Sequence, residues 1–360
     1  MPKATKTIRE VTLFFIIAFA LMVTATGYWT LISRETLLAR PDNPRALIAY
    51  NRIARGRILD RNGLILTETT GQPGNHFRSY ELSAAHVVGY ASFRYGLSGV
   101  EAAADSILSG TEGVSDSERW WKREVLGEPQ TGNDVQLTLD RALQRAAFNA
   151  LAEHSGAIVI IDPASGDILA LASAPAFDPA RLDSDFETFE AEANGPLINR
   201  ATTALYPAGR LLALFPSQLD LSSPIDLPIT TRPVVGDQVS PLHMALLTAA
   251  LANNGEMPAP RLIAATCEQT SDVSIKTSEV WQCKPRPATG HPIAIIPPAA
   301  ADSVRARMNY SLTLPSGFDD QTLGWFIGLS ADGSRALCVL LEDSTGAEAE
   351  KAANLLLLSP

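Results

Sequence analysis

A long apolar run near the start of the chain is its first hydrophobic feature. Val11–Ile32 contains no charged side chain. As a helix, this run would be about 33 Å long, enough to cross the hydrocarbon core of a bilayer. Basic residues precede it and favour a cytoplasmic N-terminus; they are Lys3, Lys6 and Arg9. We therefore expect a cytoplasmic tail over residues 1–10, a single-pass transmembrane helix over residues 11–33 and extracytoplasmic domains after it.

A cleaved signal peptide is the alternative for the same segment. Its apolar region would be Val11–Val23, and the small residues that follow would form the cleavage site. However, the apolar run continues past those small residues. Tyr28 and Trp29 stand near its far end, where aromatic residues are common at a membrane–water interface. A retained anchor is the favoured interpretation.

Residues 34–133 have an irregular pattern that is rich in turns. Asn62 and Gly63 mark a turn between two short apolar runs, and Ser98–Gly110 has a helical pattern. A sharper pattern begins at Asp134. We therefore place a domain boundary there, which divides the chain after the anchor into residues 34–133 and residues 134–360.

The second of these domains has a clear alternation of strands and helices. Periodicity, capping residues and turn residues indicate the elements. In chain order they are a strand over 135–139, a helix after Asp140, a hairpin from 157–162 and 168–173, a helix after Ser240, a hairpin from 323–329 and 335–341, and a helix over 347–357. This order predicts an α+β fold, in which an antiparallel sheet carries helices on both faces.

Composition narrows the function classes. The net charge is −10, and an acidic chain repels phosphate backbones, so we expect no nucleic-acid partner. The three cysteines have no zinc-like spacing and no HExxH motif occurs, so neither a metal nor a cofactor is expected. Cys267 and Cys283 either form a disulfide, which an extracytoplasmic location would permit, or remain free and buried like Cys338.

An acidic run follows the first predicted hairpin. Its members are Asp183, Asp185, Glu187, Glu190 and Glu192. Carboxylates in such number can bind a metal ion or cleave a glycosidic bond. A solvated helix or loop face explains the same pattern and is the favoured interpretation.

Several motifs resemble those of the class B penicillin-binding proteins. RGRILDRNG at residues 55–63 resembles the RG-x-I-x-DRNG motif of that family's pedestal, and its residues of interest are Arg55, Gly56, Asp60, Arg61 and Gly63. Further similar motifs are GLSGVE at 96–101, DVQLTLD at 134–140, SPLHMA at 240–245 and WFIG at 325–328. The resemblance implies an extended, dimerisation-like pedestal over residues 34–133 and a transpeptidase-like domain over residues 134–360.

The residues that carry the family's chemistry are missing. In the family, a serine attacks a carbonyl group and the lysine of S-x-x-K activates it. After the Y-x-P-G-like stretch at Tyr206–Gly209, Arg210 occupies the expected serine position and Ala213 the expected lysine position. A guanidinium group stays protonated, and alanine has no base. Neither half of the activating pair is therefore present.

The other two catalytic motifs are also absent. The chain contains no Ser-x-x-Lys, no Ser-x-Asn and no Lys-Thr-Gly. Pro315 stands at the lysine position of the third motif. Only 30 positions separate Arg210 from Ser240, so the helical subdomain that bears S-x-N in the family is expected to be deleted.

These observations predict a pseudoenzyme. We expect a scaffold or regulator of peptidoglycan synthesis or cell division in the cell membrane. The resemblance implies that its partner is a SEDS-family glycosyltransferase or another cell-wall synthesis protein. The alternatives are an active D,D-transpeptidase with a displaced nucleophile, a peptidoglycan-binding module that uses the vestigial groove, and a gene product without a role.

Overall fold

The computed structural model describes residues 2–29, 52–72, 75–151, 154–215, 225–269, 281–306, 309–316 and 321–357. The chain divides into two units, Met1–Asn51 and Arg52–Pro360.

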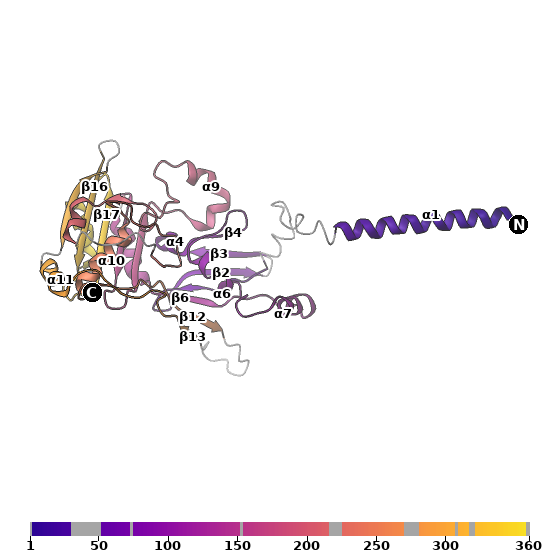
Figure 1. The fold of residues 1–360 in the computed structure, drawn as a ribbon, viewed down its shortest axis with the longest axis horizontal. Coiled ribbons are helices and arrows are strands. Elements are labelled where there is room, and N and C mark those ends of the chain that lie inside the picture. Colours follow the sequence, from indigo (N-terminus) through magenta and orange to yellow (C-terminus); the bar gives the residue numbers. More distant parts are fainter. Residues whose placement is uncertain are drawn as a thin grey trace. The chain divides into compact units, whose positions relative to one another are not determined.

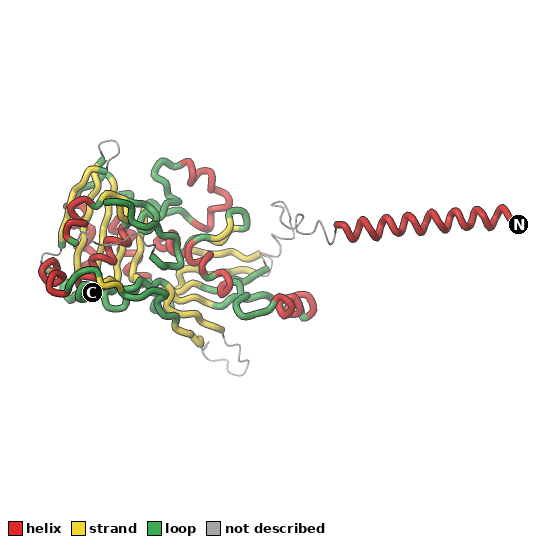
Figure 2. Tube along the Cα trace, viewed as in Figure 1, coloured by secondary structure: helices red, strands yellow, loops and turns green. Residues whose placement is uncertain are grey.

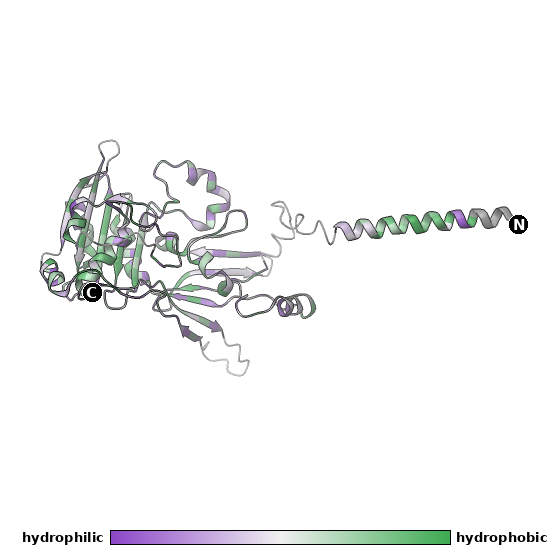
Figure 3. Ribbon diagram, viewed as in Figure 1, coloured by the Kyte–Doolittle hydropathy of each residue, from purple (hydrophilic) through white to green (hydrophobic). Residues whose placement is uncertain are grey.

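The first unit contains a single described helix, α1 (Pro2–Gly27). Its stretch Ile8–Gly27 is long and apolar enough to cross a membrane, judged by length and composition. Figure 3 shows this hydrophobic stretch along α1. The helix starts earlier than the predicted span of residues 11–33, and the last residues of that span lie outside the described part of the chain.

The second unit contains a six-stranded sheet with the order β13-β12-β6-β1-β2-β3. The strands are β1 (Ile58–Leu59), β2 (Ile65–Gln72), β3 (Asn75–Tyr80), β6 (Asp134–Leu137), β12 (Ile263–Gln269) and β13 (Trp281–Pro285). Neighbouring strands are antiparallel except β1 and β6, which are parallel. The sheet thus combines segments from both sides of the predicted boundary at residue 134, which sequence periodicity did not indicate.

Short helices and strands connect this sheet to the rest of the unit. They are η2 (Leu82–Ala84), α4 (Ala85–Val88), β4 (Ala91–Ser92), β5 (Gly96–Leu97), α5 (Gly99–Ala103), α6 (Asp105–Leu108), α7 (Asp116–Trp120) and η3 (Trp121–Val125). The predicted helical pattern over Ser98–Gly110 is therefore two short helices, α5 and α6, separated at Ala104.

A second sheet has five antiparallel strands in the order β15-β16-β17-β7-β8. They are β7 (Gly156–Ile161), β8 (Ile168–Ala174), β15 (Tyr310–Pro315), β16 (Thr322–Leu329) and β17 (Ala336–Glu342). Both predicted hairpins, β7–β8 and β16–β17, are confirmed. Figures 1 and 2 show the two sheets at different ends of the second unit.

Helices cover both faces of the five-stranded sheet. One core cluster joins Ile158 and Ile160 of β7 to residues of α8 (Arg141–Leu151) and α12 (Gly346–Leu357). The alternate residues Val159 and Ile161 belong to another cluster with α10 (Pro241–Ala252). Successive strand residues point to opposite faces, so the sheet is buried on both sides. The predicted α+β fold is confirmed.

The helix α10 shows why local sequence specified these elements well. The Ser240 hydroxyl accepts a hydrogen bond from the His243 backbone N–H, and Pro241 fills the first turn. The helix ends at Asn253, and Gly255 then takes a φ of +84°. The remaining elements are η4 (Pro179–Arg181), α9 (Leu182–Ala191), β9 (Tyr206–Pro207), η5 (Gly209–Leu214), β10 (Gln238–Val239), β11 (Glu256–Met257), β14 (Ile293–Ala294) and α11 (Pro298–Arg305).

Candidate functional site

The predicted nucleophile position lies at the start of η5. Gly209 adopts a φ of +48°, and a Cβ added there would lie 3.2 Å from Leu314 Cδ2 on β15. The structure therefore brings the segment compared with S-x-x-K next to the segment compared with K-T-G. Arg210 and Ala213 are both exposed, whereas Leu211 between them is buried.

The element that carries these two positions, η5, is a six-residue 3-10 helix that ends where Phe215 becomes extended. A 3-10 helix has three residues per turn, so Arg210 and Ala213 align on its exposed side. Neither side chain can act as a nucleophile or as a base at this place.

The described residues between Arg210 and Ser240 are 210–215 and 225–239, and they contain no α-helix. β10 pairs with β9 in antiparallel register, with Val239 opposite Tyr206. In the described part of this stretch, no helical element stands over η5.

A partly buried polar network holds β9 in place. The Tyr206 hydroxyl donates to Glu342 Oε1 at 2.6 Å, and Arg200 Nε donates to the same oxygen at 2.9 Å. Burial and the Glu342 charge raise the pKa of Tyr206 above its ordinary value. The phenol is therefore protonated at neutral pH and serves as a donor. Trp325 Nε1 also donates to the Pro207 carbonyl at 3.2 Å.

One serine–histidine contact was not foreseen from the sequence. Ser240 Oγ lies 2.8 Å from His243 Nδ1, and burial lowers the pKa of His243 to about 4. This pairing resembles an activated hydroxyl, but Ser240 is 0% exposed and His243 only 3%. A substrate cannot reach the hydroxyl, and the serine acts as the cap of α10.

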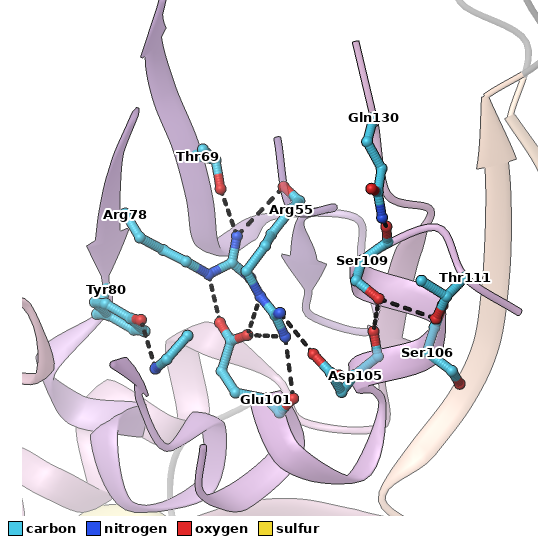
Figure 4. Close-up of polar contacts among 11 residues, drawn as sticks. Arg55, Thr69, Arg78, Tyr80, Glu101, Asp105, Ser106, Ser109, Thr111 and Gln130 are labelled. Carbon is cyan, nitrogen blue, oxygen red and sulfur yellow. Dashed lines mark hydrogen bonds and ion pairs between the residues drawn. The ribbon is translucent and has the colours of Figure 1, made fainter. Parts of the chain in front are cut away.

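The pedestal motif contributes to a buried ion-pair network, shown in Figure 4. Arg55 Nε donates to Glu101 Oε2 at 3.0 Å, and Arg55 Nη1 donates to Asp105 Oδ1 at 2.6 Å. Arg78 binds the other oxygen of Glu101 and also donates to Thr69 Oγ1 at 2.7 Å. The Glu101 side chain is fully buried, so two guanidinium groups neutralise a carboxylate that has no contact with water.

The other residues of the motif form the connection to α8. Asp60 is buried and accepts hydrogen bonds from the backbone N–H groups of Asn62, Leu64 and Arg141. The Arg61 backbone N–H donates to the Leu139 carbonyl, and Gly63 has a φ of +80°. At Gly56, a Cβ would lie 1.9 Å from the Asn133 carbonyl oxygen. These contacts hold the chain in place and offer no reactive group.

The cysteines and acidic residues occupy structural positions. Cys267 and Cys283 are joined by a disulfide between paired residues of β12 and β13, and Cys338 is free and buried. Asp183 accepts a hydrogen bond from Ser92, and Asp185 pairs with Arg181 four positions earlier. Among the described residues, no group of three or more His, Cys, Asp or Glu could hold a metal ion.

Comparison with known proteins gives this geometry a context. A family model described as the penicillin binding protein A dimerisation domain matches residues 55–135. The peptidoglycan D,D-transpeptidase PbpA of Mycolicibacterium smegmatis is 28% identical over 223 residues, which cover 56% of this chain and 44% of that protein. The peptidoglycan D,D-transpeptidase MrdA of Escherichia coli K12 is 34% identical over 127 residues, 32% of this chain and 20% of that protein.

Solved structures agree in fold. PBPA from Mycobacterium tuberculosis superposes with a TM-score of 0.66 at 18% identity, covering 84% of this chain and 98% of that structure. The D,D-transpeptidase domain of a peptidoglycan glycosyltransferase from Eggerthella lenta gives 0.65 at 21% identity, covering 85% and 97%. The chain is thus similar in sequence to peptidoglycan D,D-transpeptidases and in fold to penicillin-binding proteins. Its fold is that of their pedestal and transpeptidase domains.

The sequence matches cover only part of the relatives' own length. The matched segments span less than half the length of the M. smegmatis PbpA and a fifth of the E. coli MrdA. The family model covers the pedestal, where the network around Glu101 lies. The η5 segment lies outside that model.

Proposed function

We propose that this chain is a non-catalytic relative of the class B penicillin-binding proteins that serves as a membrane-anchored scaffold or regulator in peptidoglycan synthesis. The observation that carries the proposal is the arrangement at η5. Arg210 and Ala213 lie on the exposed side of a short 3-10 helix against Leu314. In the family that the motifs resemble, these positions hold the attacking serine and its lysine.

Two further features of the same region support the proposal. Pro315 ends β15, and proline has no backbone N–H to offer a substrate strand. The only described route from η5 to α10 is loop and a two-residue strand. Catalytic residues act as a unit, so the joint loss of nucleophile, base and substrate donors leaves little residual rate.

The parts that remain intact suit a role in contact with other proteins. The apolar helix α1 and the ion-paired pedestal are both present. We propose that the N-terminus is cytoplasmic, that the second unit is extracytoplasmic, and that a SEDS-family glycosyltransferase or another cell-wall synthesis protein is the partner. A role in division, rather than elongation, is one form of this proposal.

Labelling with a fluorescent penicillin tests the absence of catalysis. The full-length protein should give no covalent band after denaturation. PBPA from M. tuberculosis, for which a penicillin G acyl-enzyme structure exists, is the positive control on the same gel. A band that survives denaturation would instead support the alternative of an active D,D-transpeptidase with a displaced nucleophile.

Co-purification tests the scaffold role separately. The full-length protein, extracted from membranes of its own cells, should bring down the SEDS-family polymerase. A matched variant in which α1 is replaced by an unrelated apolar helix should bring down less, because the proposed contact includes the anchor. Equal recovery of the polymerase with an unrelated anchored protein would contradict the proposal.

A further inference from the structure

Exposed apolar side chains gather at one place in the second unit. Trp121, Val125 and Leu126 are 53%, 47% and 54% exposed, and they are close together in sequence. In the described residues from 52 onward, the other large apolar side chains of comparable exposure stand singly along the chain; they are Leu64, Phe77, Leu82, Ile198, Val235, Ile293 and Leu355. Adjoining exposed apolar side chains mark contact sites for a membrane or for another protein. We call Trp121, Val125 and Leu126 the apolar patch.

The local backbone presents the three side chains of the patch together. Trp121 and Val125 begin and end the π-helical turn η3, and the Leu126 N–H donates to the Trp121 carbonyl at 3.1 Å. Residues joined by such a bond lie one turn apart, so the three side chains share one side of the segment. Directly before η3, α7 is capped by Ser115, whose hydroxyl accepts from the Glu118 N–H at 3.3 Å. The patch is therefore carried by a capped helical segment.

The patch lies at the end of the second unit where the chain from the anchor enters. The second unit begins at Arg52, and the Ala54 N–H donates to the Gln130 carbonyl at 3.0 Å. Gln130 in turn lines a small cavity together with Arg119 of α7 and Lys122 of η3. Figure 1 shows α7 at the end of the second unit that holds β2 and β3, away from β16 and β17. The entry of the chain and the apolar patch therefore occupy the same end.

Charges beside the patch compensate one another. Lys122 Nζ lies 2.9 Å from Glu118 Oε1, and both side chains are half-exposed. The backbone N–H of Glu128 donates to the Lys122 carbonyl at 3.0 Å, which brings a second acidic residue close to this lysine. The whole chain also has a net charge of −10. Attraction to anionic lipids therefore contributes little here, and burial of apolar surface is the interaction that the patch offers.

We propose that the apolar patch inserts into the headgroup region of the bilayer that α1 crosses, and so holds the pedestal end of the second unit at the membrane surface. The Trp121 ring suits this depth, because tryptophan joins an apolar body to an N–H donor and is enriched at membrane–water interfaces. Val125 and Leu126 add aliphatic surface on the same side. The inference rests on the membrane anchoring in the proposed function. Lipid is chosen over a protein partner because the chain from the anchor reaches this end of the second unit first.

Spin-label accessibility in vesicles tests the inference. Val125→Cys introduces an exposed thiol, whereas Cys267 and Cys283 form a disulfide and Cys338 is buried, so a nitroxide reagent should label position 125 of the native protein. The labelled full-length protein is reconstituted into phosphatidylcholine vesicles, with a water-soluble nickel chelate on both sides of the bilayer. Collisions of the nitroxide with oxygen should be frequent and those with the chelate rare. Added salt should change neither, because the insertion is not electrostatic.

Two further variants locate the contact. Val235→Cys is the matched control, because Val235 is also a valine, is 60% exposed and lies before β10 in the transpeptidase-like part. A nitroxide there should meet the nickel chelate freely in the same vesicles. Adding Trp121→Ser to the labelled Val125→Cys protein removes the ring from the patch and should raise chelate collisions toward those of the control. All three positions are exposed, so the folded state should be retained.

The outcomes separate this inference from the proposed function. A label at position 125 that meets the chelate as often as the control would place the patch in water and overturn the inference. Spectral broadening by a neighbouring nitroxide would put a second copy of the chain on the patch in place of lipid, and would overturn it too. Neither result bears on penicillin labelling or on co-purification. Protein that fails to float with the vesicles after an alkaline carbonate wash would overturn the anchoring itself, and the inference with it.

Discussion

At the scale of single residues, the strongest constraint is the carboxylate of Glu101. It has no exposure to water and lies between the guanidinium groups of Arg55 and Arg78. A buried charge is tolerated only when it is paired and hydrogen-bonded. The RG-x-I-x-DRNG-like motif and the G-x-x-G-x-E-like motif thus contribute to one ion-pair network.

Replacement of Glu101 is expected to destabilise the fold strongly. Glu101→Gln removes the negative charge and leaves two buried guanidinium groups without it, at a cost of about 3–5 kcal/mol in the free energy of unfolding. Glu118→Gln is the matched control, because Glu118 pairs with Lys122 at a half-exposed position and should cost less than about 1 kcal/mol. Urea denaturation of the full-length protein measures both; equal costs would contradict the assigned role.

Buried histidines predict a pH dependence of stability. Burial lowers the pKa of His243 to about 4, whereas an unfolded chain has a histidine pKa of about 6.5. Between these values the unfolded state binds more protons, so this contribution is fully present above pH 6.5 and is lost as the pH falls toward 4, by up to about 3 kcal/mol. Thermal denaturation should show a weaker pH dependence for His243→Gln, but not for His291→Gln at an exposed position.

At the scale of elements, η5 sets the geometry of the segment compared with S-x-x-K. Its six residues form a 3-10 helix that stops at Phe215. A helix of this kind is short and has poorer hydrogen-bond geometry than an α-helix. Placing a serine at Arg210 and a lysine at Ala213 would therefore not restore the backbone geometry that positions these two side chains in the family.

The double variant Arg210→Ser, Ala213→Lys tests this view. We expect no covalent penicillin band, because the lysine and serine would stand on a 3-10 helix without the S-x-N and K-T-G groups. Fluorescent-penicillin labelling of the variant, beside the unmodified chain and an active relative, gives the readout. A new band at the level of the active relative, absent from the unmodified chain, would mean that these two side chains suffice for labelling and would contradict this view.

Local elements were predictable from the sequence, and their distant partners were not. The Ser240 cap, Pro241 and the Asn-Asn-Gly end define α10 through interactions within a few positions. The short form of η5 could not be predicted, because apolar residues over six positions suit several conformations. The pairing of β12 with β6 joins residues more than 120 positions apart in sequence, and no local pattern specifies such a contact.

The contact between the Ser240 hydroxyl and the His243 imidazole was not among the predictions from the sequence. Ser240 and His243 are three positions apart on one helix, so their contact could have been read from helical spacing. By contrast, a cleft lined by His86, Phe186 and Thr202 joins three separate segments of the chain, which only the fold brings together.

At the scale of the whole molecule, the disulfide and the anchor bear on location. Disulfides persist in oxidising compartments and are rare in the cytosol. Cys267 and Cys283 are joined across β12 and β13, whereas Cys338 is a buried thiol whose pKa is raised by its burial. This state agrees with a second unit on the outer side of the membrane.

Thiol counting in cells provides the measurement. Denatured but unreduced protein should take up one maleimide-linked polyethylene glycol chain, at Cys338, and reduced protein should take up three. A Cys267→Ser, Cys283→Ser variant should take up one chain in both states, and should unfold more easily by about 3 kcal/mol because a 16-residue loop is no longer closed. Three accessible thiols without reduction would place the second unit in a reducing compartment.

The six-stranded sheet takes strands from both parts of the chain, and this limits how far the chain can be truncated. Three of its strands, β6, β12 and β13, follow residue 133, and two of them come from residues 263–285. A gene truncated to the pedestal would leave the β1 edge without its partner and open to aggregation. The second half of the chain is therefore needed to keep the first half folded, whatever the chemistry at η5.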